Sequence, residues 1–227
     1  MKVLIVDTAL NACTAAVFEN DRPLGLRSEL MAKGHQERIA GLVRDAVADA
    51  GGFEGIDRIG VTVGPGSFTG LRVGLAFAQG LGAALGVPVV GISTLAALAR
   101  TQDGGIGASA AVIDARRGQV YVQTFRDGVP AMVPTALSLD AARDALSDEA
   151  WNWAGSGASL ITDLPTPDAV TTATPKALAD LTLLADPPNA PPSPLYLRAP
   201  DATPPTRLPG QPRRQTPKPS ILSSPPT

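Results

Sequence analysis

His35 is the only histidine of the chain, and its imidazole could serve metal binding or general-base chemistry. Two histidines four residues apart on one helix would form a metal clamp, because both imidazoles would then lie on the same face. Here the position one turn after His35 is Ile39. A pairing of His35 with Ser67 for nucleophilic catalysis is conceivable, but nothing in the sequence orients it. The sequence therefore predicts neither a zinc or iron site of ordinary type nor a catalytic set.

Two aspartates each end a predicted strand. Asp7, followed by Thr8, ends the aliphatic run 2–7, and Asp114 follows the run 110–113, with Arg116 two residues further on. Acidic side chains at such strand ends resemble those that flank the nucleotide cleft of actin-like folds, and they also occur as simple turn or cap residues. Both interpretations remain open. Arg116 itself could contact a phosphate or lie in solvent.

A glycine-rich loop, Gly64-Pro65-Gly66-Ser67, precedes a predicted helix at about 69–85. It lacks the Gly-Lys-Ser/Thr ending of a P-loop, and its glycine spacing differs from the dinucleotide fingerprint. A loop that opens a helix can still offer backbone N–H groups to an anion, or it can be a purely structural tight turn. We expect Ser67 or Thr69 to cap the helix through its hydroxyl.

The helix at 69–85 is apolar almost all round. Between Gly70 and Gly86 only Arg72 and Gln79 are strongly polar, so nearly every face needs to be covered. The stretch carries five glycines, each of which costs about 1 kcal/mol relative to alanine inside a helix. We expect close approach by a neighbouring backbone to compensate for them.

Composition limits the possible functions. The 227 residues carry a net charge of −2, so no global charge excess favours nucleic-acid or membrane binding. Cys13 is the single cysteine, which excludes an internal disulfide and is typical of a reducing cytoplasm. The N-terminal apolar run is too short for a signal peptide, and Gln79 and Pro88 interrupt the apolar stretch 73–92, so we expect no membrane span.

The order of predicted elements indicates an α/β protein made of two related halves. In the first half we predict strands at 2–7, 13–18, 24–29, 59–63 and 88–90, and helices at 34–50, 69–85 and 93–100. In the second half we predict strands at 110–113, 119–125, 131–134 and 150–154, and helices at 139–146 and 176–184. The glycines at 104–107 suggest a boundary between subdomains 1–103 and 104–200. The tail 201–227 is rich in proline and is predicted to be disordered.

Several motifs together resemble the TsaB (YeaZ) family of the actin/Hsp70-like ATPase superfamily, over about residues 1–200. They are Ile5-Val6-Asp7-Thr8, Gly34-His35-Gln36-Glu37-Arg38, the run from Gly64 to Arg72, Gly91-Ile92-Ser93-Thr94-Leu95, the run from Ile113 to Tyr121, and Tyr196-Leu197-Arg198. The resemblance implies two actin-like (ASKHA) subdomains with mixed sheets flanked by helices, the second one reduced. The second half also carries Gly155-Ser156-Gly157-Ala158, which resembles the adenosine-side loop of that superfamily.

The resemblance also implies a function. Members of the family support the transfer of a threonylcarbamoyl group to the adenosine beside the anticodon of tRNA. Their catalytic paralogue, TsaD, holds a metal through an H-x-x-x-H helix, and the ATPase TsaE joins the complex. We therefore expect a non-catalytic subunit that pairs with TsaD, reaches tRNA only through the complex, and is able to form a homodimer when alone. The alternatives are a glycoprotease-like metallopeptidase and an independent actin-like ATPase or kinase.

The family resemblance also suggests site residues. No cofactor is expected to be required, and weak ATP or ADP binding would involve Asp7, Thr8, Asp114, Arg116, Gly155 and Gly157. Pairing in the family uses two helices of the N-terminal half. The expected partner interface therefore comprises His35, Ile39, Val43, Leu71, Gly74, Leu75, Ala78 and Leu81.

Overall fold

The computed structural model describes residues 1–162 and 170–198. The predicted disordered tail, 201–227, lies outside the described residues. The elements of the first half are β1 (Lys2–Asp7), β2 (Ala12–Glu19), β3 (Arg22–Leu30), α1 (His35–Asp49), β4 (Ile56–Gly64), α2 (Phe68–Leu85), β5 (Val89–Ser93) and α3 (Thr94–Asp103). Those of the second half are β6 (Ala108–Arg116), β7 (Gln119–Arg126), β8 (Val129–Pro130), β9 (Thr135–Ser138), α4 (Leu139–Ala145), β10 (Asn152–Ala154), α5 (Ala158–Ile161), α6 (Pro175–Leu184) and the 3₁₀ turn η1 (Pro187–Asn189).

The first sheet has the strand order β3-β2-β1-β4-β5. β2 is antiparallel to both β1 and β3, while β4 is parallel to β1 and β5 is parallel to β4. The central strand β1 is aliphatic throughout because it is covered on both faces. Leu4 and Val6 point to one face, and Val3 and Ile5 point to the other.

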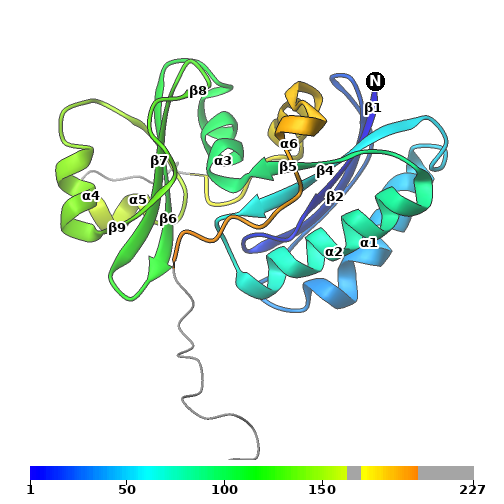
Figure 1. The fold of residues 1–227 in the computed structure, drawn as a ribbon, viewed down its shortest axis with the longest axis horizontal. Helices are drawn as coiled ribbons and strands as arrows, with labels where there is room; N and C mark the ends of the chain where they lie inside the picture. Colours follow the sequence, from blue (N-terminus) through cyan, green and yellow to red (C-terminus); the bar gives the residue numbers. More distant parts are fainter. Residues whose placement is uncertain (163–169, 199–227) are drawn as a thin grey trace, which may run out of the picture.

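Helices cover both faces of this sheet (Figure 1). α1 and α2 pack on the face of Leu4 and Val6, where Ile39, Val43 and Leu75 complete the core. On the opposite face α6 packs against Val3 and Ile5. α3 lies between the two sheets, because its Leu95 and Leu98 join a core with residues of β6 and β7.

The second sheet repeats the topology of the first. β9, β7, β6 and β10 pair in the same senses as β3, β2, β1 and β4: antiparallel, antiparallel and parallel. A counterpart of β5 is missing from the described part of this sheet, and β8 adds a short pairing at the far end of β7. The two mixed sheets flanked by helices confirm the predicted fold class, with two actin-like halves of which the second is smaller.

Most predicted elements of the first half lie within a few residues of those observed. The second half shows several differences. The strand predicted at 131–134 is the loop between β8 and β9, and neither these two strands nor the short helix α5 was predicted. The helix α6 belongs in space to the first sheet, although the sequence placed it in the second subdomain. The division at residue 103 therefore does not separate the two halves completely.

The glycines on the inner side of α2 let the helix approach the end of β1 closely. An ideal Cβ on Gly70 would lie 2.1 Å from the Thr8 carbonyl oxygen, and one on Gly74 would lie 2.3 Å from Thr8 Oγ1. Thr8 Oγ1 donates to the Gly70 carbonyl at 2.8 Å, which ties the helix to the end of β1. Ser67 caps the helix by accepting from the Gly70 N–H, as one of the two predicted caps.

Among the described residues, α2 is the one helix long and apolar enough to cross a membrane by length and composition. Its buried side, which includes Leu71, Leu75 and Ala78, faces the sheet of its own chain. The same composition is found in core helices of globular proteins, so it is weak support for a membrane span.

Candidate functional site

A cleft of about 480 Å³ opens between the two sheets. It is lined by Ala9, Leu10, Asn11, Ala32, Gly66, Ser67, Ile113, Asp114, Ala115, Arg116, Tyr121, Ser156 and Thr171. These residues come from the loop after β1, the loop that opens α2, the end of β6 and the loop after β10. The cleft thus lies beside the ends of β1 and β6, the two strands that carry Asp7 and Asp114.

Two of the predicted nucleotide residues, Asp114 and Arg116, line this cleft. Arg116 Nη1 lies 2.9 Å from Asp114 Oδ2, and the backbone N–H of Arg116 donates to Asp114 Oδ1 at 2.7 Å. The Asp114 backbone N–H in turn donates to Ser156 Oγ at 3.2 Å. The carboxylate is therefore engaged by its own loop, and an exposed ion pair of this kind contributes little to stability.

Asp7 and Thr8 are buried below the cleft and do not line it. Asp7 Oδ1 accepts from the Ala9 N–H at 2.9 Å and from Thr62 Oγ1 at 2.7 Å. Burial raises the pKa of Asp7, and these two hydrogen bonds and the nearby His35 oppose that shift. The two residues thus hold β1 to β4 and to α2, which is the structural interpretation that the sequence left open.

Gly155 and Gly157 pack against β6. An ideal Cβ on Gly155 would lie 2.2 Å from the Val112 carbonyl oxygen, and the Gly157 N–H donates to that oxygen at 2.9 Å. The space beside these glycines is filled by the chain itself. Of the six residues predicted to hold a nucleotide, the structure brings only Asp114 and Arg116 to the cleft. The arrangement does not fit a nucleotide held by paired acidic strand ends.

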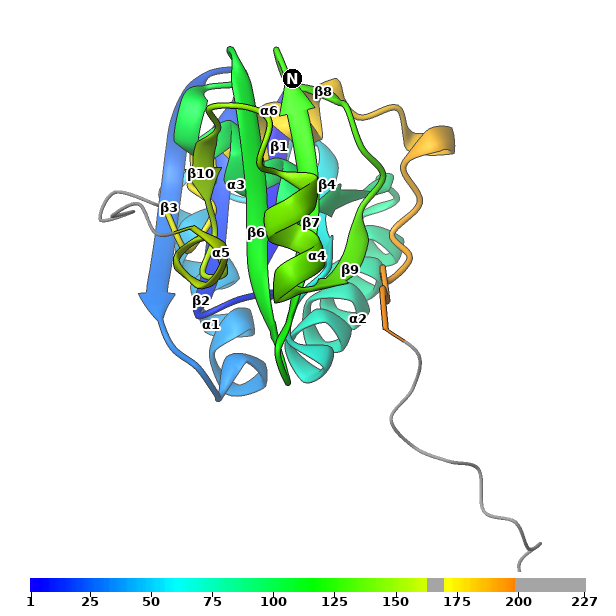
Figure 2. The ribbon, with the colours of Figure 1, turned by 90° about the vertical axis from the view of Figure 1, so that its left-hand side faces the viewer.

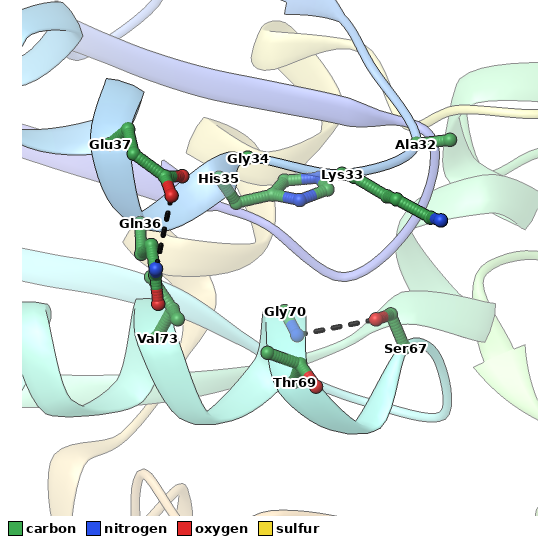
Figure 3. Close-up of a pocket in the computed structure, with 10 residues that line it drawn as sticks. All are labelled: Ala32, Lys33, Gly34, His35, Gln36, Glu37, Ser67, Thr69, Gly70 and Val73. Atoms are coloured by element: carbon green, nitrogen blue, oxygen red, sulfur yellow. Dashed lines mark hydrogen bonds between the residues drawn. The ribbon is translucent and has the colours of Figure 1, made fainter.

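A second pocket, of about 430 Å³, lies where the N-terminal ends of α1 and α2 meet (Figure 3). Its lining is Ala32, Lys33, Gly34, His35, Gln36, Glu37, Ser67, Thr69, Gly70 and Val73. His35 is 6% exposed, and its Nε2 donates to the Leu10 carbonyl at 3.2 Å. Ile39 is buried one turn later in the core under α1. The described residues hold no group of three His, Cys, Asp or Glu side chains that could bind a metal.

The glycine loop before α2 is a tight turn. The Ser67 N–H donates to the Ala9 carbonyl at 2.8 Å, and an ideal Cβ on Gly66 would lie 2.4 Å from that oxygen. Cys13 is equally enclosed, and burial raises the pKa of its thiol to about 11. Ser67 lines the cleft, but its hydroxyl caps α2, and the Cys13 thiol is buried outside the cleft lining.

The structure places most of the predicted interface residues inside the chain. His35, Ile39, Val43, Leu71, Gly74, Leu75 and Ala78 are buried, and Leu81 is half-buried. The family resemblance suggested these positions, but most of them lie on the side of α1 or α2 that packs on the sheet of the same chain. The seven buried side chains therefore offer no surface to a partner, and the half-buried Leu81 stays a predicted contact. The opposite side of α2, here called the outer face, consists of the exposed Ala76, Gly80, Ala83 and Ala84, with Val73 and Phe77 at its edge, where they also pack against the core.

A C-terminal strap, residues 190–198, runs along the first sheet and on to the second half (Figure 1). The Leu195 N–H donates to the Val63 carbonyl at 2.8 Å, and Arg72 Nε donates to Tyr196 Oη at 3.1 Å. Arg198 Nη2 then reaches the β6–β7 hairpin, at the Arg116 carbonyl and at Gln119 Oε1, 2.6 Å away. Tyr196 and Arg198 entered the sequence analysis only as part of a family motif, because no periodicity reveals contacts between residues 79 to 124 positions apart.

Comparison with known proteins agrees with this architecture. The family model for TsaD, tRNA N6-adenosine threonylcarbamoyltransferase, matches residues 14–145. An uncharacterized protein of Mycobacterium tuberculosis is 38% identical over 206 residues, which are 89% of this chain and 94% of the relative. The TsaB protein of Escherichia coli is 38% identical over 124 residues, which are 53% of each chain. The structure of YeaZ from Pseudomonas aeruginosa superimposes with a TM-score of 0.72 at 29% identity, covering 86% of this chain and 99% of that one.

This chain belongs to the TsaB/YeaZ family. The TsaB/YeaZ assignment applies to both halves, because the YeaZ match extends over most of the chain. In the second half of this TsaB/YeaZ chain, α4 and α5 lie on the side of β6 and β7 that faces away from the first sheet (Figure 2).

Proposed function

We propose that this chain is the non-catalytic, activating subunit of a complex that attaches a threonylcarbamoyl group to the adenosine beside the anticodon of tRNA. Three relatives support a role in this biosynthesis, because they bear the name tRNA threonylcarbamoyladenosine biosynthesis protein TsaB. They come from Escherichia coli, Haemophilus influenzae and Bacillus subtilis, at 38%, 36% and 30% identity. The catalytic partner would be a TsaD paralogue, with TsaE as a third component.

The outer face of α2 is the observation that carries this proposal. Ala76, Gly80, Ala83 and Ala84 are exposed there, and Val73 and Phe77 are half-buried beside them. An ideal Cβ on Gly80 would meet no atom of the described residues within 4 Å, so the described part of the chain leaves the helix uncovered at that point. Small side chains allow a second helix to approach closely, and an apolar helix face of this kind is typical of a protein contact surface.

The non-catalytic role is inferred from the residues around His35. Its Nε2 is bonded to a backbone carbonyl, and Ile39 occupies the position from which a second ligand would reach the same metal. The cleft offers Asp114 and Arg116 alone from the predicted nucleotide set, so we propose at most weak ATP or ADP binding there. No observation in the described residues favours the metallopeptidase or the independent kinase.

A pairing experiment tests the proposal. The full chain carrying Ala83→Glu would be co-purified with a TsaD-family protein, and threonylcarbamoyl transfer to tRNA would be measured with the same preparation. We expect at least a tenfold loss of pairing and a matching loss of transfer, because a carboxylate would be buried in an apolar contact. Ala145→Glu is the matched control, since Ala145 is also an exposed alanine in a helix but lies in α4 of the second sheet.

Equal pairing by the Ala83→Glu and Ala145→Glu variants would contradict the assigned surface. A preparation of the chain alone that transfers the group at the rate of the complex would contradict the non-catalytic role. In the absence of a TsaD-family protein we expect a homodimer through the same outer face, and Ala83→Glu should then shift the protein to monomer in sedimentation experiments.

A further inference from the structure

Arg72 is the only charged side chain of α2, and it borders the outer face. It is exposed, as Ala76 and Ala83 are. Side chains four or seven residues apart lie on the same side of a helix, so these three residues form one row. A second helix seated on Ala76 and Ala83 therefore reaches Arg72 one turn further toward the N-terminal end of α2. The charge of Arg72 then bears on which partner the outer face accepts.

Two aromatic rings hold the Arg72 guanidinium in place. Its Cζ atom lies 3.7 Å from the centroid of the Phe68 ring and 6.0 Å from that of the Tyr196 ring. Its Nε donates to Tyr196 Oη at 3.1 Å. The strap that carries Tyr196 passes beside α2 (Figure 2) and is tied to it by Gln79, whose Nε2 donates to the Pro192 carbonyl at 2.9 Å. The orientation of the guanidinium is thus set before any partner arrives.

The two Nη groups of Arg72 are left unused. Within residues 1–162 and 170–198 they have no acceptor, and no carboxylate contacts this guanidinium. Exposed arginines elsewhere do have such a contact, since Arg38 pairs with Glu29 and Arg126 pairs with Glu149. The first turn of α2 also lacks an acidic residue, so incoming negative charge would suit the N-terminal end of the helix dipole.

A partner on the outer face has to answer this charge. Covering Ala76 would take water away from the neighbouring guanidinium, which stays protonated at any ordinary pH. A charge that loses its water without gaining a counter-charge is costly. A second copy of α2 brings no carboxylate of its own, because Arg72 is its one ionisable residue. The surface therefore favours a different helix, one that carries an acidic side chain.

We propose that Arg72 selects the partner of the outer face by receiving a carboxylate from the partner's helix through its two Nη groups. Phe68 and Tyr196 act as positioning residues that fix the plane of the guanidinium. A guanidinium held in this way binds a carboxylate through two parallel hydrogen bonds, and an ammonium group does not reproduce that fork. That the partner is the catalytic subunit rests on the proposed function, whereas the need for a carboxylate rests on the surroundings of Arg72.

Calorimetric titration of the full chain with a TsaD-family protein tests the proposal. Arg72→Ala should weaken pairing at least about tenfold, and Arg72→Lys should weaken it nearly as much although the charge is kept. Arg22→Ala is the matched control, since Arg22 is also exposed but lies at the start of the edge strand β3. The homodimer of the chain alone should not be weakened by Arg72→Ala. Equal weakening of both assemblies, or full pairing by Arg72→Lys, would overturn the assigned role.

The positioning role of Tyr196 has a separate readout. Tyr196→Phe keeps the ring and removes the acceptor of the Arg72 Nε–H, so it should weaken pairing about twofold to fivefold. In a chain that already carries Arg72→Ala, the same change should have no further effect, because Tyr196 acts through the guanidinium. Losses that simply add would show that Tyr196 contacts the partner itself.

A charge exchange identifies the carboxylate. Arg72→Glu should abolish pairing, and one Asp→Arg or Glu→Arg change in the partner's facing helix should restore it. Failure of every such exchange would overturn the proposed carboxylate contact.

The outcomes also separate this inference from the proposed function. Loss of pairing on Ala83→Glu together with full pairing by Arg72→Ala would refute the inference and leave the proposed function intact. Pairing that depends on Arg72, in a complex that transfers no threonylcarbamoyl group, would do the reverse.

Discussion

At the scale of single residues, Asp7 shows how a group suited to chemistry can serve structure. Its carboxylate is fully enclosed and is held by the Ala9 N–H and the Thr62 hydroxyl. Desolvation raises the free energy of an ionised carboxylate in such a place, and hydrogen bonds from two neutral donors offset this cost only in part. His35 is similar, because its Nε2 donates a hydrogen bond to the Leu10 carbonyl. Asp7 thus joins the end of β1 to β4, and His35 joins the start of α1 to the loop after β1.

The raised pKa of Asp7 predicts a pH-dependent stability. Above the ordinary value of 3.8 the unfolded chain releases its proton first, while the native protein keeps its own until the higher folded pKa is reached. The native state then binds more protons, so stability falls as the pH rises through this interval. The Asp7→Asn variant should not lose stability in this interval, so its free energy of unfolding should exceed that of the original chain from pH 4 upward. This difference in the free energy of unfolding is about 1.4 kcal/mol for each tenfold difference in proton affinity of Asp7 between the folded and the unfolded state.

Urea unfolding at several pH values between 4 and 8 measures this difference. Thr62→Val is the companion variant, because it removes one donor to the carboxylate and should lose more stability as the pH rises. Parallel stability curves for the original chain and Asp7→Asn would show that Asp7 does not titrate differently in the folded state.

At the scale of elements, α2 has two unlike sides. The side with Gly70 and Gly74 approaches Thr8 so closely that side chains would not fit. The side with Gly80 faces open space. The sequence shows glycines along the whole helix, but their reasons differ, since the inner ones permit contact with the sheet and the outer one leaves a flat surface.

Two substitutions to alanine in α2 should therefore have opposite effects. Gly70→Ala places a Cβ against the Thr8 carbonyl and should cost about 1 to 3 kcal/mol, because the backbone must shift. Gly80→Ala meets nothing and should gain up to about 1 kcal/mol from helix propensity. Thermal unfolding of both variants tests the contrast, and a loss of equal size at both positions would refute this account of the helix.

At the scale of the molecule, the two halves are joined by more than the chain connection. α3 packs between the sheets, α6 returns from the second half to the first, and the strap links α2 to the β6–β7 hairpin through Tyr196 and Arg198. The cleft is bounded by segments from both halves. The shape of the cleft therefore depends on contacts between residues distant in sequence.

The strap predicts a measurable effect on the hairpin. Arg198→Ala removes the hydrogen bonds to the Arg116 carbonyl and Gln119 Oε1, so amide hydrogen exchange at the β6–β7 turn should become several-fold faster. Exchange in the central strand β1 should stay unchanged. Arg143→Ala is the control, since Arg143 bonds within the α4–α5 region. Unchanged exchange at the turn would show that the strap does not restrain it.

The sequence by itself determined the fold class and most elements of the first half, because strand runs such as 2–7 and helix signals such as the Ser67 cap are local. It also showed that Ile39 stands where an H-x-x-x-H metal site would have its second histidine, since a single position is enough to reveal a missing metal ligand. Only the tertiary structure decided which apolar residues face outward. Leu75 and Ala76 are adjacent in sequence, yet Leu75 is buried in the core against the sheet and Ala76 is exposed. Likewise, the strap brings Tyr196 to Arg72 and Arg198 to the Arg116 carbonyl, and these contacts depend on how the two sheets and the strap close on one another.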